Sequence, residues 1–213
     1  FSVISVLTIF DSMELAIRDS IEELGDDVLF VQKWPWAGGN DYPWWKYYKR
    51  PEADLQDLKE IQRRSLATEA AAFMFEVQRT VKFKGNSIED VSVLGISHDF
   101  DRVMTIDLEE GRYFTLLESQ SGRNVAMVGS KIAENLFAGA SPIGKEIKVF
   151  GNKVEVIGVM KKEGEDLFGN SSDNQVMLPV NFARKHIDID EIGTTILVKA
   201  KPYVSNDELR DEL

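Results

Sequence analysis

The sequence predicts an α+β fold, because segments with strand periodicity and segments with helical periodicity alternate along one chain. The clearest strand runs from Phe73 to Phe83, where apolar and polar side chains alternate, so that one face is buried and the other is wet. Residues 124–159 then combine a short apolar strand, a helix and a hairpin, in the order β-α-β-β. A chain of 213 residues can bury a sizeable core, as one large domain or as two small ones.

The first ten residues carry no charge and are followed by Asp11. A helix of this length rises about 15 Å, half the hydrocarbon core of a bilayer, so it cannot span a membrane alone. A buried strand or a signal-peptide remnant fits the composition, but no charged segment precedes the run. Helical spacing continues to Gly25, which can close a helix in the left-handed conformation. The apolar stripe of this expected helix consists of Met13, Ile17, Ile21 and Leu24.

Three elements flank the Phe73 strand. Val28 to Gln32 is predicted to be a buried strand of the core. A helix with apolar positions 55, 58 and 61 follows, with Asp54 as its N-cap and Asp57 in its first turn. After the Phe73 strand, Gly85-Asn86 is expected to turn the chain into a returning strand from Val91 to Ile96.

Between Lys33 and Pro51 lies a segment rich in aromatic residues, including all four tryptophans of the protein. One hypothesis is a recognition loop, since rigid rings supply a large contact area at low entropic cost to proteins, sugars or membrane interfaces. The alternative is a long loop that folds back and buries its own rings. The candidate partner-contact residues are Trp34, Trp36, Tyr42, Trp44, Trp45, Tyr47 and Tyr48.

The central segment begins with a strand from Val125 to Val128, after which the Ser130 hydroxyl is expected to cap a helix. Pro142 and Gly144 prevent that helix from continuing. A hairpin is expected from residue 147 to residue 159, with Gly151-Asn152 as its tight turn, because this pair supplies positive φ. We expect the apolar face of the helix to pack on this hairpin; the face consists of Ile132, Ala133, Leu136 and Phe137.

The C-terminal part of the chain is predicted to hold two strands and two helices. The first strand, Val176 to Val180, contains Pro179, which lacks an N–H and therefore suits a sheet edge. A short helix near residues 181–186 and a strand at 195–200 follow. The last helix opens with Ser205 and Glu208 at capping-box spacing.

The sequence also resembles a known family, in matches that run in order along nearly the whole chain. In the central segment the matching residues are Val128-Gly129-Ser130, Ile132-Ala133, Asn135-Leu136-Phe137, Pro142-Ile143-Gly144-Lys145 and Val156-Ile157-Gly158-Val159. Upstream they are Glu22, Leu24-Gly25, Val28-Leu29-Phe30-Val31 and Gly111-Arg112-Tyr113-Phe114, and downstream they are Gly164, Asp173, Val176 and Leu178-Pro179. On these residues the chain resembles the extracytoplasmic (periplasmic) core domain of MacB/FtsX-type ABC transporter permeases.

This resemblance implies a porter-like α/β sandwich subdomain with an inserted smaller, β-rich subdomain. Residues 1–24 are then expected to be the end of the first transmembrane helix and its stalk. Residues 25–107 and 175–213 are expected to form the porter-like subdomain, and residues 108–174 the insert. The aromatic segment is not part of the family pattern, so the resemblance implies nothing about its role.

The function implied by the resemblance is mechanical and not enzymatic. ATP binding by a cytoplasmic ABC ATPase domain or subunit would close a dimer of two permease copies, and the stalk helices would carry that motion into the periplasm. The domain would belong to the inner (cytoplasmic) membrane and face the periplasm, where a periplasmic adaptor and an outer-membrane channel are the further partners implied for an exporter. A role in lipoprotein extraction or in regulating cell division stays open within the same family.

Composition excludes several other functions. The net charge is -11, from 25 Lys and Arg against 36 Asp and Glu, so the surface repels phosphate backbones and nucleic acid is not expected as a partner. The chain has no cysteine, hence no disulfide framework and no thiol chemistry. It has no Gly-rich loop ending in Gly-Lys-Ser/Thr, so nucleotide hydrolysis by this chain is not expected.

No catalytic, cofactor or metal site is expected either. Ser97-His98-Asp99 is no catalytic triad, because adjacent side chains diverge; a surface or capping role is expected for His98. Ile192 stands where a calcium loop would need an oxygen ligand. The alternative to the permease is a secreted glycan-binding or glycan-cleaving module. That alternative requires the tryptophans to form an exposed coplanar platform beside two carboxylates about 5–10 Å apart.

Overall fold

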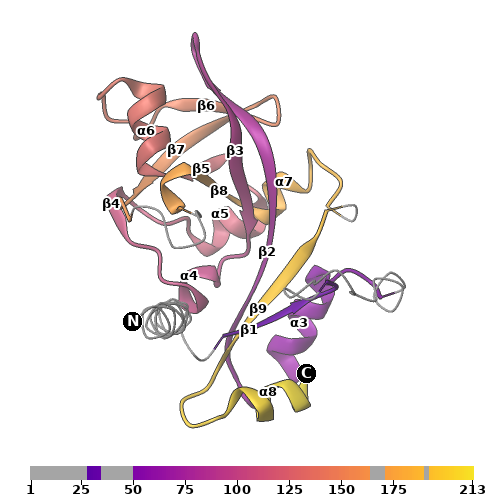
Figure 1. Ribbon diagram of the computed structural model, residues 1–213. Coiled ribbons are helices and arrows are strands. Elements are labelled where there is room, and N and C mark those ends of the chain that lie inside the picture. The colour runs from indigo at the N-terminus through magenta and orange to yellow at the C-terminus, as the bar shows by residue number, and fades with distance from the viewer. Residues whose placement is uncertain (1–27, 35–49, 164–170, 190–191) are drawn as a thin grey trace, which may run out of the picture.

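The computed structural model describes residues 28–34, 50–163, 171–189 and 192–213, and these form an α+β fold, as predicted (Figure 1). The nine strands are β1 (Val28–Gln32), β2 (Thr68–Phe83), β3 (Asn86–Ile96), β4 (Leu108–Gly111), β5 (Val125–Val128), β6 (Glu146–Val149), β7 (Asn152–Met160), β8 (Gln175–Pro179) and β9 (Thr194–Ala200). The helices are α3 (Leu55–Arg64), α4 (Phe100–Val103), α5 (Leu116–Ser121), α6 (Ser130–Phe137), α7 (Val180–Ala183) and α8 (Asn206–Glu212), with a 3-10 turn η1 (Ser172–Asn174).

The strands of the described residues make one mixed sheet in the order β1-β9-β2-β3-β8-β5-β7-β4, with β6 pairing both β2 and β7. The pairs β3·β8 and β5·β7 are parallel and the others antiparallel. Strand β8 joins the two regions that the domain prediction separates, because it pairs with β3 on one side and with β5 on the other. The boundaries of the porter-like and inserted subdomains stay a prediction.

Strands β2 and β3 form the long hairpin that the alternating pattern predicted. The turn is Lys84-Gly85, since Phe83 pairs with Asn86, so the expected turn was placed one residue too late. Strand β2 is also longer than predicted, and Ala70 to Phe73 are buried on both faces of the sheet. The reason is that this half of β2 pairs with β9, and that α3 and α4 pack against β2.

Two helix starts agree with the sequence prediction in detail. Asp54 caps α3 by accepting from the backbone N–H of Gln56 and Asp57, and the Asp57 carboxylate accepts from the Asp54 N–H in return. Ser205 and Glu208 form the same reciprocal capping box at the start of α8. Both caps depend on residues at most three positions apart, which is why sequence alone identified the N-cap at Asp54 and the capping box at Ser205; the reciprocal bond to Asp57 was not predicted.

The central segment folds as a strand, a helix and a hairpin, but two of its details differ from the prediction. The N-cap of α6 is Gly129, and the Ser130 hydroxyl donates to the buried Asp173 carboxylate at 2.9 Å instead of capping the helix. The β6-β7 turn is Phe150-Gly151, both with positive φ, since Val149 pairs with Asn152. The predicted α6 face is buried in one cluster with the hairpin, as expected; the cluster includes Ile132, Leu136, Phe137, Ile147, Val149, Val154 and Val156.

Two predictions, one about the burial of a strand and one about a position in the sheet, were wrong. Strand β1 is only half-buried. It is the end strand of the sheet, so it has a neighbouring strand, β9, on one side and none of the described strands on the other. Pro179 is not at a sheet edge, since β8 lies between β3 and β5. It is tolerated there because it is the last residue of β8 and the N-cap of α7, where no further ladder bond is needed from its nitrogen.

Candidate functional site

Of the residues predicted to contact a partner, Trp34 is the one that the structure describes. It follows β1, its side chain is 39% exposed, and the Lys33 ammonium lies 5.6 Å from the centroid of its ring. Lys33 is held in turn by Glu52, at 3.3 Å. The other candidate contact residues, Trp36, Tyr42, Trp44, Trp45, Tyr47 and Tyr48, and the stalk residues Met13, Ile17, Ile21 and Leu24, lie outside the described residues.

A groove of about 710 Å³ opens on one face of the sheet. Its floor is made by side chains of neighbouring strands, Phe30, Leu197, Met74, Leu94 and Met177, which the strand register places on the same face. One wall consists of Phe100 and Met104 in and after α4, together with Met160 at the end of β7. Four of the six methionines of the protein line this groove, and thioether side chains adapt to irregular surfaces.

The rim of this groove is polar and mostly acidic, with Glu76, Asp90, Asp107 and Glu163 against Lys131. The Ser92 hydroxyl donates to the Glu76 carboxylate at 2.5 Å, so these two lining residues are hydrogen-bonded to each other. Over the part of the chain that the structure describes, no three His, Cys, Asp or Glu side chains converge as metal ligands would. The groove thus combines an apolar floor with a polar, mostly acidic rim.

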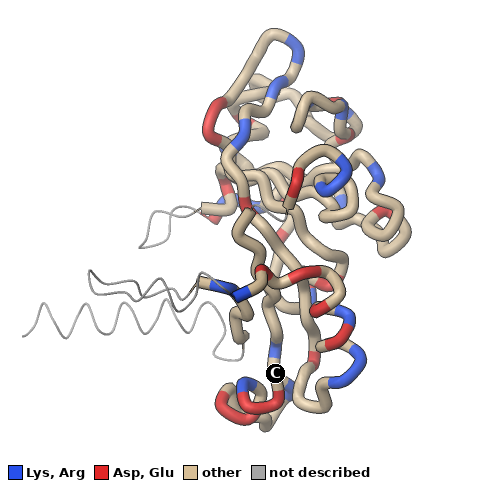
Figure 2. The backbone as a smooth tube through the Cα atoms, turned by 90° about the vertical axis from the view of Figure 1, so that its right-hand side faces the viewer, with Lys and Arg blue, Asp and Glu red and all other residues tan. Residues whose placement is uncertain are grey.

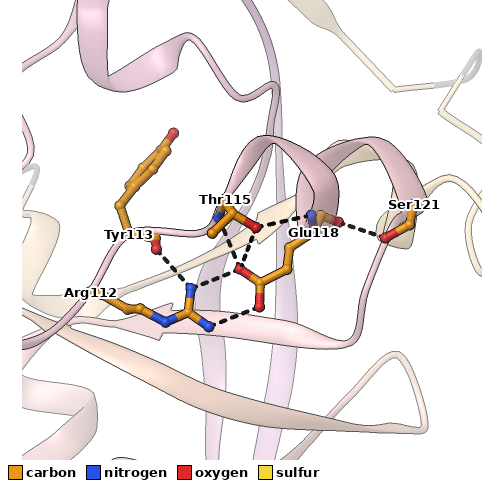
Figure 3. A network of polar contacts seen from close by, with 5 residues as sticks. All are labelled: Arg112, Tyr113, Thr115, Glu118 and Ser121. Atoms are coloured by element: carbon orange, nitrogen blue, oxygen red, sulfur yellow. Dashed lines mark hydrogen bonds and ion pairs between the residues drawn. The ribbon is translucent and has the colours of Figure 1, made fainter.

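A second polar arrangement joins β4 to α5 (Figure 3). The Arg112 guanidinium donates two hydrogen bonds to the Glu118 carboxylate, at 2.7 and 2.8 Å. Glu118 is buried and also accepts from the backbone N–H and the hydroxyl of Thr115, at 2.9 and 3.0 Å. The hydrogen bonds from Arg112 lower the pKa of Glu118 from its ordinary 4.5 to about 2. We call these three side chains the Arg112–Glu118 network. Its role is structural, because Arg112, Glu118 and Thr115 are hydrogen-bonded to one another within the domain.

From the Arg112–Glu118 network we expect the free energy of unfolding to decrease at acidic pH. A carboxylate whose pKa is lowered on folding stabilises the protein above its unfolded pKa, and this contribution is lost as the pH falls through the folded value. For Glu118 the loss is expected between pH 4.5 and about 2. Glu118→Gln should lower the free energy of unfolding at pH 7 by about 1.5–3 kcal/mol, the range for a hydrogen bond to a charged group, and should flatten the decline in that acid window.

Urea unfolding followed by circular dichroism from pH 2 to pH 7 measures both effects. Glu109→Gln, in an exposed position on the neighbouring strand β4, is the matched control and should leave the curve unchanged. An equal acid-dependent decline in the parent and in Glu118→Gln would show that this carboxylate does not control stability in acid.

The buried carboxylate of Asp173 joins the start of α6 to Glu163, which follows β7. Asp173 accepts from the Ser130 hydroxyl and from the Glu163 backbone N–H, at 2.9 and 3.1 Å. Ser172 donates to the Glu163 carboxylate at 2.7 Å. The sequence did not predict the hydrogen bond between Ser130 and Asp173, because these residues are 43 positions apart and no local pattern connects them. It also missed Glu118, although Thr115 and Glu118 stand at capping-box spacing.

The histidines show no catalytic arrangement. His98 is half-buried, with its ring centroid 6.0 Å from that of Tyr113 and 6.4 Å from that of Phe114, so the expected surface or capping role is wrong. The Tyr113 hydroxyl donates to the His98 carbonyl at 3.1 Å, and burial raises the pKa of Tyr113. His186 packs edge-on against Phe182, at 4.8 Å between centroids. His98 is thus half-buried near two aromatic rings, whereas His186 is exposed.

Comparison with known proteins gives one consistent family. The sequence model of the MacB-like periplasmic core domain matches residues 1–213. The macrolide export ATP-binding/permease protein MacB of Neisseria gonorrhoeae is 26% identical over 200 residues, which cover 94% of this chain and 30% of that protein. The pyoverdine export ATP-binding/permease protein PvdT of Pseudomonas aeruginosa is 31% identical over 99 residues, 46% of this chain and 15% of that protein.

The fold agrees with the crystal structure of the periplasmic region of MacB from Actinobacillus actinomycetemcomitans. The TM-score is 0.72 at 15% sequence identity, over 90% of this chain and 82% of that one. This chain thus spans about a third of the length of the curated MacB proteins that it matches. None of the helices in the described parts of the chain has both the length and the apolar character needed to cross a bilayer.

Proposed function

Since this chain belongs to the MacB-like periplasmic core domain family, and is thus the periplasmic core domain of a MacB-like ABC transporter permease, we propose that it transmits ATP-driven motion across the inner membrane into the periplasm, for export or envelope maintenance. The domain itself performs no chemistry in this proposal. A cytoplasmic ABC ATPase domain or subunit supplies the energy, as the ATP-binding/permease names of the relatives suggest. A second permease copy completes the dimer, and a periplasmic adaptor with an outer-membrane channel is the further partner of an exporter.

One observation carries the proposal: the two ends of the described domain lie at the same end of the sheet. Val28, the first residue of β1, pairs with Lys199 near the end of β9, and α8 contacts β1 (Figure 1). A domain placed between two membrane helices needs both of its connections on the side that faces the membrane. This arrangement meets that need.

The same end of the sheet is tied together in a way that suits force transmission. The Glu212 carboxylate of α8 accepts from the backbone N–H of Leu66 and of Ala67, at 2.5 and 2.9 Å. Lys201 adds two hydrogen bonds to the same link, from its backbone N–H to the Ala67 carbonyl and from its ammonium to the Leu66 carbonyl. A displacement of α8 is therefore passed directly to the start of β2.

From there the motion has a stiff path. Strand β2 pairs with β9 along its first half and with β3 along its second half, so a load along the strands is shared by many hydrogen bonds. The β2-β3 hairpin extends to the far end of the molecule from α8 (Figure 1). A small movement at the membrane side thus moves the hairpin tip as part of one body, as in the rigid-body transitions that couple distant sites.

The proposal is tested with the whole permease and its ATPase in lipid nanodiscs. The 213 residues contain no cysteine, so Ser87→Cys, exposed at the start of β3, can be spin-labelled without background from this domain. We expect the distance between the labels of the two copies to change when ATP is trapped, and to return with ADP. An unchanged distance in an enzyme that hydrolyses ATP would overturn the proposal.

A second variant tests the proposed path of motion from α8 to β2. Glu212→Ala removes the link from α8 to Leu66 and Ala67, and it should reduce the ATP-dependent change at Ser87 while ATP hydrolysis continues. Asp211→Ala, an exposed acidic residue one position earlier, is the matched control and should leave the change intact.

A further inference from the structure

The groove on the face of the sheet has two ends of different character. At its apolar end, Phe30 of β1 lies opposite Leu197 of β9, and Leu94 of β3 lies opposite Met177 of β8. Phe100 of α4 belongs to the same apolar cluster and forms part of the wall. This end therefore offers apolar surface, and a ligand that removes this surface from water gains free energy.

The other end of the groove is polar and begins two residues further along the same strands. Gln78 of β2 lies opposite Ser92 of β3, which lies opposite Gln175 of β8. Direct partners point to the same face of a sheet, so these side chains continue the floor. The Ser92 hydroxyl donates to Glu76, and Asp90 lines the groove two positions before Ser92. The exposed carboxylates of Glu76 and Asp90 thus stand beside the apolar floor.

The charge of the groove lining is one-sided. Acidic and basic residues occur together over the length of the molecule (Figure 2), but four acidic residues line the groove against one described basic residue, Lys131. None of the described Lys, Arg or His side chains forms an ion pair with Glu76, Asp90 or Asp107. The potential in the groove therefore favours a cation over a neutral molecule or an anion.

We propose that this groove is the binding site of a small molecule with an extended apolar body and one ammonium group. The ammonium donates charge-assisted hydrogen bonds to the carboxylates of Glu76 and Asp90, and the body covers Leu94 and Met177. The volume of about 710 Å³ lies within the range of about 300–1,000 Å³ for small-molecule sites, which favours such a ligand over a protein segment. This inference goes beyond the proposed function and does not depend on it, because the groove lies within one copy of the domain and binding needs no ATP.

Photochemical labelling tests the site in the whole permease in nanodiscs. The probe is a benzophenone with an alkylammonium chain, and the comparison probe has a hydroxyl group in place of the ammonium. Excited benzophenone inserts into C–H bonds and reacts readily with methionine. Mass spectrometry then identifies the modified residues, and modification of the membrane part corrects for the partition of each probe into lipid. The methionines that line the groove are Met74, Met104, Met160 and Met177.

We expect saturable modification of these methionines by the ammonium probe. Half-saturation should occur at a concentration about three- to tenfold lower than for the hydroxyl probe, as expected for two exposed charge pairs. Added salt should raise the half-saturation concentration of the ammonium probe only, since exposed charges are screened.

A double variant, Glu76→Gln with Asp90→Asn, removes both charges with little change of shape. Gln keeps an acceptor for the Ser92 hydroxyl, and Asn tolerates the φ of 53° at position 90. The half-saturation concentration of the ammonium probe should rise about three- to tenfold, and that of the hydroxyl probe should not change. Glu89→Gln, exposed on β3 beside Asp90 but outside the groove lining, is the matched control and should leave both values unchanged.

The comparison of the two probes on the parent protein needs no variant, so a folding defect cannot hide the result. Absent or unsaturable modification of the groove methionines overturns the inference. Equal half-saturation for the two probes, or an equal effect of the double variant and of Glu89→Gln, would show that the groove does not recognise the ammonium, and the assigned ligand class would then be wrong.

Discussion

Gly129→Ala is expected to lower the free energy of unfolding by about 3–5 kcal/mol, the upper range for single substitutions. A Cβ at Gly129 would lie 2.2 Å from the Asp173 carbonyl oxygen and 2.3 Å from that of Ser172. Both atoms belong to the backbone of η1, so no side-chain rotation relieves the overlap. The Gly129 backbone N–H also donates to the Gln175 carbonyl at 2.8 Å, which holds the two segments together.

The damage should extend to the buried polar contact beside it. Moving η1 away from α6 separates the Ser130 hydroxyl from the Asp173 carboxylate and leaves a buried charge poorly paired. Chemical denaturation with circular dichroism as the signal measures the loss. Gly85→Ala is the matched control, because a Cβ there meets no atom within 4 Å, and it should change stability by less than about 1 kcal/mol. Equal stability of the two variants would mean that η1 does not pack on Gly129 in solution.

Leu136→Ala is expected to cost about 2–5 kcal/mol, the range for truncating a buried leucine. Leu136 is 1% exposed in α6 and lies in the largest apolar cluster of the described residues, together with side chains of β2, β3, β5 to β8 and α7. Its removal leaves a cavity between α6 and the sheet, because strands on the other side are fixed by their ladders and cannot close it. The same denaturation experiment measures the change.

Leu117→Ala is the control for this variant, since Leu117 is exposed on the short helix α5. It should change stability by less than about 0.5 kcal/mol, as surface substitutions do. A parent-like midpoint for Leu136→Ala would show that α6 packs loosely, and the account of the central segment would then be wrong.

The family finding and the fold agree with the permease prediction, while the aromatic segment is still without a role. Trp34 shows that this segment leaves the sheet at the end of β1 with an exposed ring beside Lys33. The platform required by the glycan alternative involves tryptophans outside the described residues. Family membership over residues 1–213 favours the permease over that alternative.

What the sequence determined by itself was local. The N-cap at Asp54 and the capping box at Ser205 and Glu208 were predicted residue by residue, because each depends on hydrogen bonds between positions at most three apart. Both hairpins were found from alternating side chains and a glycine. Their turns were misplaced by one residue, since Lys84 and Phe150 adopt positive φ just before the glycine. Positive φ in a non-glycine residue is imposed by the pairing of the flanking strands, and composition does not reveal it.

Only the tertiary structure decided which segments meet. The sequence did not show that β8 lies inside the sheet or that Ser130 binds Asp173 instead of capping its helix. Nor did it show that Lys201 and Leu66 share the end of the sheet where β1 begins. The physical reason is that closing a long loop costs little more than closing a shorter one, so partners far apart in the chain leave no spacing signal. Their pairing follows from strand order and burial, which exist only once the chain has folded.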